Sequence, residues 1–585
     1  MPGHPTSPGP EDPGAVNQRT KAHSPPRAVR DSGVGLLPEA ARRVLLGYGV
    51  DAPRVRRILA LLSDGRWWSA DDLVRACSVA HSVVTAVLRD LREAEELDAE
   101  TGDGRRRVRL LRPADYHGAA GDELADPVAH LLPLYARAAT VLTRAVRQAP
   151  ASDLDLDHVA ATAHTALRRA LLLNTRFDLS DRTLLCVGDH DLTSIAVALV
   201  SPGTRVEVVD VDERVLAHID AVAAEEGLIV RTHFADLRLG LPSTLHGCAD
   251  VVFTDPPYTP DGVELFVRRG LEGMADPRRG RVLVAYGASE TTPRLAATTQ
   301  ARMVRMDLLV EAVWPDFNQY HGAESIGAAS DLYVLRPLTR VPARASSDSA
   351  RVYSQGANAK ESRGGMDADL ARGVLDAVSA DLGGGAGRRD VTLVGDWPQE
   401  EAAGRVRLST WLASPVSASE HAVINLVGGW ERLLSRAALA SSSDTVYAVV
   451  PSSAEAVRDQ AGQRALRALV EPRFEVRFLR GFGGRHLTAV RLTRHPDPDT
   501  PVERLLVHVQ ERAHGMVRAT LRGGLAEVAA WTGRPINKRS SRHAVASAPP
   551  WLSGHTLLDL PGHRLAALPG VAEELVLRLE ADDQW

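Results

Sequence analysis

A loop rich in carboxylates follows one short apolar stretch of this 585-residue chain. Residues 183–187 are Thr-Leu-Leu-Cys-Val, and Gly188, Asp189 and Asp191 come directly after them, with Thr193 close behind. A strand that runs through such a loop into a helix is typical of an open α/β sheet, in which ligands bind beyond the carboxyl ends of the strands. We therefore expect residues 188–194 to face a ligand.

Further carboxylates follow the next three apolar stretches. Asp210 and Asp212 lie about 20 residues after the first loop, where an acidic residue accepts hydrogen bonds from a ribose. Asp236 follows the third stretch, a common place for contacts to adenine. Asp255 follows the fourth stretch, and residues 255–258 are Asp-Pro-Pro-Tyr. Together these strand ends predict a site for a nucleoside-bearing sulfonium such as S-adenosylmethionine.

The acidity of the first loop favours a cationic ligand. The carboxylate of intact S-adenosylmethionine would meet Asp189 and Asp191, whereas decarboxylated S-adenosylmethionine has only an ammonium group in that place. The loop thus favours the decarboxylated nucleoside and penalises the intact one. A polyamine would be favoured for the same reason.

Several motifs together resemble those of one family, the branched-chain polyamine synthases, also called bis(aminopropyl)spermidine synthases. The similar segments are residues 188–196, 209–214, 236–238, 253–257 and 316–320. An upstream Asp157-His158, followed by Thr162, is similar to a further element of the family. The resemblance covers roughly residues 40–337, and residues beyond 365 show none.

The resemblance implies an aminopropyl transferase that uses decarboxylated S-adenosylmethionine and releases methylthioadenosine. An alkyl ammonium has a pKa near ~10 and must lose its proton before the nitrogen can attack carbon. Asp255 is the candidate acceptor of that proton, with Asp189 and Asp191 orienting the cations. The implied cofactor-binding residues are Gly188, Thr193, Asp210, Asp212 and Asp236. The implied substrate-binding residues are Asp157, His190, Pro256 and Tyr258.

Two residues depart from the family pattern. His190 replaces the middle acid of a Gly-Asp-Asp-Asp loop, and Tyr258 replaces the glutamate of an Asp-Pro-Pro-Glu motif. The loss of two carboxylates points to an acceptor with less positive charge than spermidine. Asp-Pro-Pro-Tyr is also typical of methyltransferases that act on exocyclic amino groups of nucleobases. An amino-group methyltransferase that uses intact S-adenosylmethionine is therefore an alternative.

The alternation of apolar strands and helices predicts an α/β fold, with a Rossmann-like, doubly wound sheet of the methyltransferase type. Residues 133–148 and 156–173 are expected to be helical. The expected divisions of the chain are a disordered tail (1–35), a winged-helix-like domain (36–115), a helical connector (116–182), the Rossmann-like catalytic domain (183–337), a linker (338–365), a degenerate second α/β domain (366–500) and a helical C-terminal region (501–585).

The winged-helix order of three helices and a hairpin raises a third, non-enzymatic alternative, a regulator that senses a polyamine or nucleoside. Acidic residues near the end of the third helix would repel phosphate, so DNA binding is the weaker expectation. These are Asp90, Glu93, Glu95 and Glu96.

Composition excludes several classes of protein. The net charge of −5 gives no overall attraction to nucleic acid, and only three of the 69 basic residues are lysine, as in proteins from GC-rich genomes. Three scattered cysteines predict neither disulfides nor a cysteine-rich metal site, and the histidines have no metal-ligand spacing. No apolar run approaches the ~18 residues of a membrane span. We expect a cytoplasmic protein with a small-molecule amine as partner, no metal and no membrane contact; a homodimer is left open.

Overall fold

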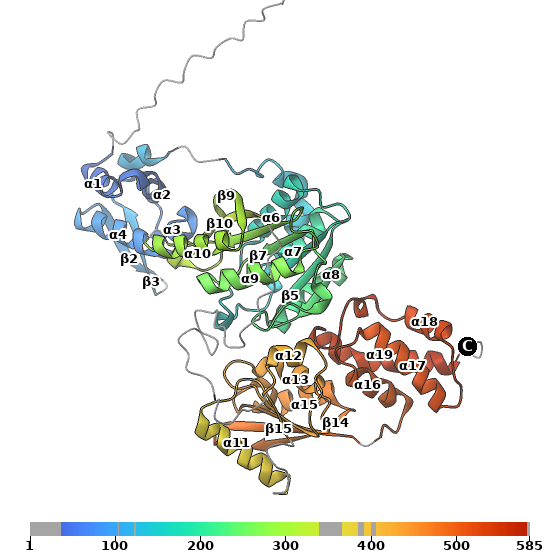
Figure 1. The fold of residues 1–585 in the computed structure, drawn as a ribbon. Helices are drawn as coiled ribbons and strands as arrows, with labels where there is room; N and C mark the ends of the chain where they lie inside the picture. The colour runs from blue at the N-terminus through green and yellow to red at the C-terminus, as the bar shows by residue number, and fades with distance from the viewer. Residues whose placement is uncertain are drawn as a thin grey trace, which may run out of the picture. The chain divides into compact units, whose positions relative to one another are not determined.

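The computed structural model describes residues 37–102, 104–121, 125–289, 291–338, 366–383, 391–398, 405–495 and 497–581 (Figure 1). The expected tail, and the expected linker apart from Leu338, lie outside these residues. The chain divides into two compact units. One contains residues 1–69 and 86–122, and the other contains residues 70–85 and 123–585.

The N-terminal part contains four helices and a small antiparallel sheet. The helices are α1 (Glu39–Gly47), α2 (Ala52–Leu62), α3 (Ala70–Cys77) and α4 (His81–Glu93). The strands are β1 (Trp68–Ser69), β2 (Leu97–Gly102) and β3 (Arg105–Leu110), in the order β1-β3-β2. The predicted helices and hairpin are confirmed as elements, while the winged-helix assignment stays a prediction.

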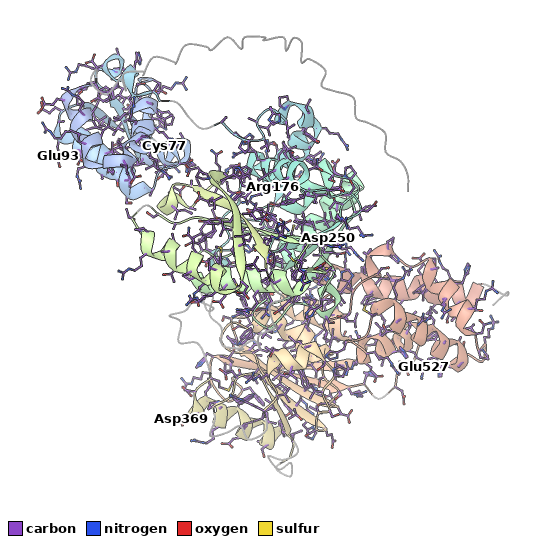
Figure 2. All side chains as sticks on the ribbon, turned by 45° about the horizontal axis from the view of Figure 1, so that its top comes forward. Cys77, Glu93, Arg176, Asp250, Asp369 and Glu527 are labelled. Carbon is purple, nitrogen blue, oxygen red and sulfur yellow. The ribbon has the colours of Figure 1, made fainter. Side chains whose placement is uncertain are left out.

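A seven-stranded mixed sheet in the order β6-β5-β4-β7-β8-β10-β9 forms the centre of the second unit. Its strands are β4 (Thr183–Val187), β5 (Arg205–Asp210), β6 (Val230–Phe234), β7 (Val251–Thr254), β8 (Arg281–Tyr286), β9 (Leu308–Gln319) and β10 (Ala329–Pro337). The accompanying helices are α5 (Ala136–Gln148), α6 (Ala163–Arg176), α7 (Thr193–Val200), α8 (Glu213–Glu226), α9 (Pro260–Gly273) and α10 (Pro293–Arg305). In Figure 2, Arg176 marks the end of α6, and Asp250 directly precedes β7.

The apolar strands are buried on both faces of this sheet because helices cover both faces. Every residue of β4 is buried, and neighbouring side chains point to opposite sides. Leu184 and Cys186 pack into one core with α6, α7 and α8, whereas Leu185 and Val187 pack into another with α9 and α10. The predicted Rossmann-like α/β sheet is confirmed at the level of an α/β fold with a mixed sheet.

The prediction of a helix over residues 156–173 is wrong for residues 156–162. Residues 154–156 form a short 3-10 turn, Asp157 adopts a left-handed conformation, and α6 begins only after Thr162, whose hydroxyl caps it. The backbone of residues 159–161 instead bonds to the loop after β4. The helix predicted over residues 133–148 likewise begins later, at Ala136.

The C-terminal lobe, residues 366–581, contains a second sheet in the order β11-β12-β13-β15-β14. These strands are β11 (Val391–Val394), β12 (His421–Asn425), β13 (Thr445–Pro451), β14 (Phe474–Arg480) and β15 (Leu487–Arg494), which confirms the predicted strands. The helices are α11 (Ala368–Asp381), α12 (Leu408–Ala413), α13 (Leu434–Leu439), α14 (Glu455–Arg458), α15 (Gln460–Val470), α16 (Pro501–Glu511), α17 (Val517–Trp531), α18 (Lys538–Ala546) and α19 (Gly562–Ala581).

The second sheet has the topology of part of the first. Three parallel strands are followed by an antiparallel pair, as in β4-β7-β8-β10-β9, and no strands correspond to β5 and β6 in the described part of the lobe. Gly395, with φ +96°, follows β11 as Gly188, with φ +71°, follows β4. Register places Asn425 where Asp255 stands in the first sheet. This correspondence supports the idea of a degenerate second copy.

The C-terminal lobe covers the edge of the first sheet at β6. The backbone N–H of Phe234 donates to the carbonyl of Asp559 at 2.8 Å. A ring nitrogen of His555 lies 3.0 Å from the carbonyl oxygen of Thr232. An uncovered edge strand would invite pairing with other chains, so these contacts protect it. Among the described residues no helix combines the length and apolarity that crossing a bilayer requires.

A buried histidine, His233, lies between the first sheet and the C-terminal lobe. The ring nitrogens of His233 are 3.0 Å from Glu207 on β5 and 3.0 Å from Asp559 of the C-terminal lobe, and its ring stacks on His555. Arg231 also pairs with Glu207. Burial lowers the pKa of His233, but the two carboxylates outweigh it and raise the pKa to about 8.

Protonated His233 should therefore stabilise the folded chain. The contribution is complete below pH 6.5, the ordinary pKa of histidine, and is lost as the pH rises through about 8. We expect wild-type stability to fall by about 2 kcal/mol across that window. His233→Gln should show a flatter thermal unfolding temperature over the same range. The control is His130→Gln, since His130 is exposed; equal pH dependence in His233→Gln and wild type would contradict the assignment.

Candidate active site

The loops after β4 and β7 meet at the point where the chain order of the sheet reverses. β4 and β7 are parallel neighbours, and the successive strands β5 and β6 lie on one side of β4 while β8 lies beyond β7. Such a switch point is where open α/β sheets bind ligands. A hollow that is partly open to solvent lies there. Its lining includes Asp157, Gly188, His190, Asp210 and Asp255 among the predicted site residues.

The turn at Gly188 requires glycine. Its φ is +71°, and a β-carbon would lie 3.0 Å from a ring carbon of Phe266 on α9. Asp210 holds the loop from the neighbouring strand, because its carboxylate accepts the backbone N–H groups of Asp189 at 3.0 Å and Asp212 at 2.9 Å. The loop is thus fixed before any ligand binds.

Asp189 and Asp191 are buried behind the hollow and have protein partners. The two oxygens of Asp189 accept the backbone N–H groups of Thr193 at 2.9 Å and Ser194 at 3.1 Å, at the start of α7. Burial raises the pKa of Asp189 to about 7. Asp191 accepts the N–H of Ala161 at 2.7 Å. A role of either carboxylate in holding a substrate ammonium stays a prediction.

A fully buried arginine of α6 joins the two loops. Arg169 donates to Asp191 at 2.9 Å and to Asp255 at 2.6 Å. It also donates to Asn318 Oδ1 at 2.7 Å and to the Thr193 hydroxyl at 3.2 Å. Burial would lower the pKa of Arg169, but Asp255 and Asp191 raise it above its usual value. The guanidinium therefore stays charged and neutralises part of the acidity that the sequence suggested.

Two tyrosine hydroxyls complete the surroundings of Asp255. The Tyr320 hydroxyl lies 2.8 Å from Oδ2 and the Tyr258 hydroxyl 3.1 Å from Oδ1. The two hydroxyls are 2.7 Å apart, and Ser330 lies 2.8 Å from that of Tyr320. Burial raises the pKa of Asp255 to about 7, against the lowering effect of Arg169. This value suits a group that exchanges a proton near neutral pH.

Burial would also raise the pKa of Asp191, but His190 and Arg169 outweigh it and lower the pKa below its usual range. The two carboxylates on one guanidinium therefore differ in proton affinity. Asp191 stays ionised while Asp255 can take up a proton.

His190 stacks on His158, which belongs to the upstream Asp157-His158 element but was not among the predicted site residues. The rings of His158 and His190 are 4.5 Å apart and nearly parallel. His190 Nε2 lies 3.0 Å from the carbonyl oxygen of Val159 and 3.3 Å from Asp191. Burial lowers the pKa of His190, but Asp191 and Asp255 raise it above its usual value. Burial and His190 lower that of His158 to about 4.

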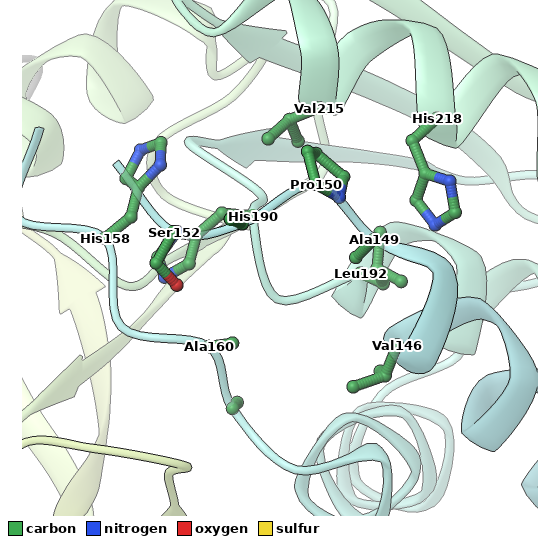
Figure 3. Close-up of a pocket in the computed structure, with 12 residues that line it drawn as sticks. Val146, Ala149, Pro150, Ser152, His158, Ala160, His190, Leu192, Val215 and His218 are labelled. Carbon is green, nitrogen blue, oxygen red and sulfur yellow. The ribbon is translucent and has the colours of Figure 1, made fainter. Parts of the chain in front are cut away.

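Both histidines also line a second hollow, next to α5 (Figure 3). His218 and Ser152 contribute to it, and the other lining side chains are apolar. Acidic side chains are absent from the lining of this hollow, which makes it a poor place for a polycation.

Asp212 and Asp236 flank the main hollow without lining it. Asp212 caps α8 and pairs with Arg214 at 2.6 Å. Asp236 pairs with Arg238 at 2.6 Å. Their chain neighbours Val211, Ala235 and Leu237 form part of the wall. Pro256 is buried behind the wall, and the adjacent Pro257 lines it.

Sequence reasoning missed the buried polar cluster around Asp255. Its members are Arg169, Asn318, Tyr320 and Ser330. Two signals could have found it. Arg168 and Arg169 interrupt an otherwise apolar helical stretch, and Asn318 and Tyr320 belong to a motif already noted for its resemblance.

The arrangement suits proton transfer next to a bound nucleoside. One carboxylate with a raised pKa reaches the hollow, and Asp210 lies at the strand end where a ribose binds. Within the described ranges, His, Cys, Asp and Glu form no group of three suited to a metal ion.

Comparison with known proteins finds similarity to one family over part of the chain. Residues 138–351 match the family model described as the branched-chain polyamine synthase A C-terminal domain. An uncharacterized protein of Methanocaldococcus jannaschii is 36% identical over 190 residues, which cover 32% of this chain and 47% of the relative. The N(4)-bis(aminopropyl)spermidine synthase of Thermus thermophilus is 36% identical over 135 residues, 23% of this chain and 39% of the relative. The chain thus spans less than half the length of the curated relatives it matches.

Among solved structures, the branched-chain polyamine synthase from Thermus thermophilus, in complex with N4-aminopropylspermidine and 5'-methylthioadenosine, is 24% identical with a TM-score of 0.39. The match covers 56% of this chain and 97% of that one. The resemblance predicted from the motifs, to the branched-chain polyamine synthase family, is therefore confirmed for residues 138–351.

Proposed function

We propose that this protein transfers an aminopropyl group from decarboxylated S-adenosylmethionine to an amine of a polyamine-like acceptor. The observation that carries the proposal is the presence of Asp255, a carboxylate with a raised pKa, in the same hollow as Gly188 and Asp210. Three similar proteins that are N(4)-bis(aminopropyl)spermidine synthases support it.

In the proposed reaction, the acceptor nitrogen attacks the carbon next to the sulfonium. A carbon–nitrogen bond forms, the carbon–sulfur bond breaks, and sulfur keeps the electron pair as methylthioadenosine leaves. The proton of the attacking nitrogen passes to Asp255. Gly188, Thr193, Asp210, Asp212 and Asp236 shape the nucleoside site, while Asp189 and Asp191 fix the loop and contribute negative charge.

The acceptor is proposed to carry less positive charge than spermidine. Arg169 offsets the charge of Asp191 and Asp255, and His190 stands beside them with a raised pKa. A polycation would have to approach these cations, which costs electrostatic energy in a buried site. Asp157, Tyr258 and His190 are the proposed contacts to the acceptor.

The direct test is product mass after incubation with the donor and a panel of mono-, di- and polyamines. We expect methylthioadenosine and an acceptor heavier by one aminopropyl group, with less charged amines preferred. The matched control replaces the donor with intact S-adenosylmethionine, whose carboxylate the acidic loop should disfavour. A methylated product with the intact nucleoside, and none with the decarboxylated one, would instead establish the methyltransferase alternative.

Asp255→Asn should lower kcat by a factor of about 100 or more, because the amide cannot accept the proton. Binding of methylthioadenosine, measured by calorimetry, should change little. The wild-type rate should rise with pH through about 7 as Asp255 loses its proton, and the variant should lack that rise. Asp261→Asn, which alters a carboxylate paired with Arg302, is the control. Unchanged kcat in Asp255→Asn would remove Asp255 from the mechanism.

Arg169→Gln should destabilise the fold and abolish turnover. Removing one partner of a buried ion pair costs about 3–5 kcal/mol because it leaves charge uncompensated. Chemical unfolding would measure the loss. Arg176→Gln on the same helix is the control, since Arg176 is partly exposed and lies 3.9 Å from Glu311. Equal stability of the two variants would show that Arg169 is not structurally required.

A further inference from the structure

One short segment of the C-terminal lobe contacts the loop after β6, the start of α8 after β5 and the segment before α6, all of which flank the nucleoside side of the site. This segment, residues 429–436, runs from the end of the loop after β12 through the 3-10 turn Glu431–Leu433 into α13. We propose that it positions the walls of the nucleoside pocket, and that Trp430 is its main positioning residue. The inference rests on the proposed function for the identity of the nucleoside.

The first wall is the loop after β6. Arg238 is buried and holds Asp236, to which it donates at 2.6 Å. The same guanidinium donates to the carbonyl of Gly429 at 2.8 Å and lies 3.8 Å from the ring centre of Trp430. A buried cation stacked on indole is held strongly. Trp430 and Gly429 thus fix the arginine that orients Asp236, between the wall residues Ala235 and Leu237.

The second wall is the loop after β5. Arg436 forms an ion pair with Glu213, with 2.5 Å between the guanidinium nitrogen and Oε1, and stacks on Phe234 with 4.0 Å between the guanidinium carbon and the ring centre. Glu213 begins α8 next to Asp212, and the backbone N–H of Gly562 also donates to Glu213 at 2.7 Å. The start of α8, and with it the loop that contains Val211, is held from the C-terminal lobe.

The third wall is the segment before α6. Arg432 donates to Asp153 at 2.5 Å, and Arg214 lies 3.8 Å from the same carboxylate. Arg214 in turn pairs with Asp212. The residues that follow Asp153, from Leu156 to His158, line the hollow. A series of ion pairs therefore connects Arg432 with both the segment before α6 and the loop after β5.

These three sets of contacts all act on the arginines or carboxylates that flank the hollow. Asp212 and Asp236 are each paired with an arginine, so they cannot move toward a ligand unless that arginine moves too. The segment fixes Arg238 directly and Arg214 through Asp153. The effect of Trp430, which acts on the loop after β6, should therefore appear in the affinity for the nucleoside and not in that for the acceptor, because the proposed acceptor contact Asp157 belongs to the wall that Arg432 holds.

The test compares Trp430→Ala, Trp430→Phe and Arg432→Gln in the full chain. Calorimetry with methylthioadenosine and with intact S-adenosylmethionine measures nucleoside affinity. We expect Trp430→Ala to weaken binding by about five- to thirtyfold, and Trp430→Phe, which keeps an aromatic face, by about threefold or less. Arg432 is half-exposed, so Arg432→Gln should fold normally and weaken binding by about three- to tenfold.

The matched control is Trp551→Ala. Trp551 stacks on Arg564, which pairs with Asp220 on α8, so it also belongs to a contact between the lobes but not to a pocket wall. An equal loss of affinity in Trp551→Ala would indicate general loosening and would overturn the inference. Wild-type affinity in a folded Trp430→Ala would overturn it too. Steady-state kinetics provide a second measurement. We expect the KM for the donor to rise in Trp430→Ala and the KM for the acceptor to stay unchanged.

The coupling to Asp236 gives a further readout. If Trp430 acts through Arg238 and Asp236, then Trp430→Ala should cost little additional affinity in an Asp236→Asn background. Full additivity would overturn the route through Asp236. Failure of the proposed reaction can be told apart from failure of this inference. If only the reaction is wrong, the wild type gives no aminopropyl product, but the variants still differ in their affinity for the nucleosides. A wild-type chain that binds neither nucleoside would overturn both.

Discussion

The arrangement of the site depends on one buried guanidinium. Arg169 binds carboxylates from two different loops, Asp191 after β4 and Asp255 after β7. If Arg169 were absent, the buried carboxylates of Asp191 and Asp255 would repel each other with no cation between them. Its other partners, Asn318 and Tyr320, belong to the antiparallel end of the sheet, so one side chain joins three parts of the fold. Such a group is costly to bury and is retained only when nearly all of its donors have partners.

The same interaction changes how the acidic loop is understood. From composition, the loop after β4 is a negatively charged receptor for a cation. In the structure, Asp189 caps a helix, Asp191 holds Arg169, and His190 stacks on His158. Much of the charge is therefore used to build the loop. The carboxylates that line the hollow are those of Asp157, Asp210 and Asp255, and burial raises the pKa of Asp255 to about 7.

The C-terminal lobe makes extensive contacts with the first sheet and its loops. It covers the edge strand β6, shares an apolar core with the helices on one face of the sheet, and places arginines and a tryptophan against the loops after β5 and β6. Its own sheet repeats part of the first, with Asn425 at the place of Asp255 and without strands that correspond to β5 and β6 in its described part. An amide at that place cannot accept a proton, which fits a supporting role.

The sequence by itself determined the α/β class, the strands of both sheets and the loops that carry the site, because buried parallel strands require continuous apolar runs and strand ends require turn residues. Its motifs also predicted Gly188 and Asp255 as site residues, and both line the hollow. The tertiary structure alone decided the partners. Several of these partners lie far along the chain from the loops that they contact, namely Arg169, Tyr320 and Trp430. The periodicity of apolar residues does not indicate which distant side chains come into contact. The loop at residues 157–162 was mistaken for helix for the same reason, since its conformation is set by bonds to Asp191 and His190 and not by local preference.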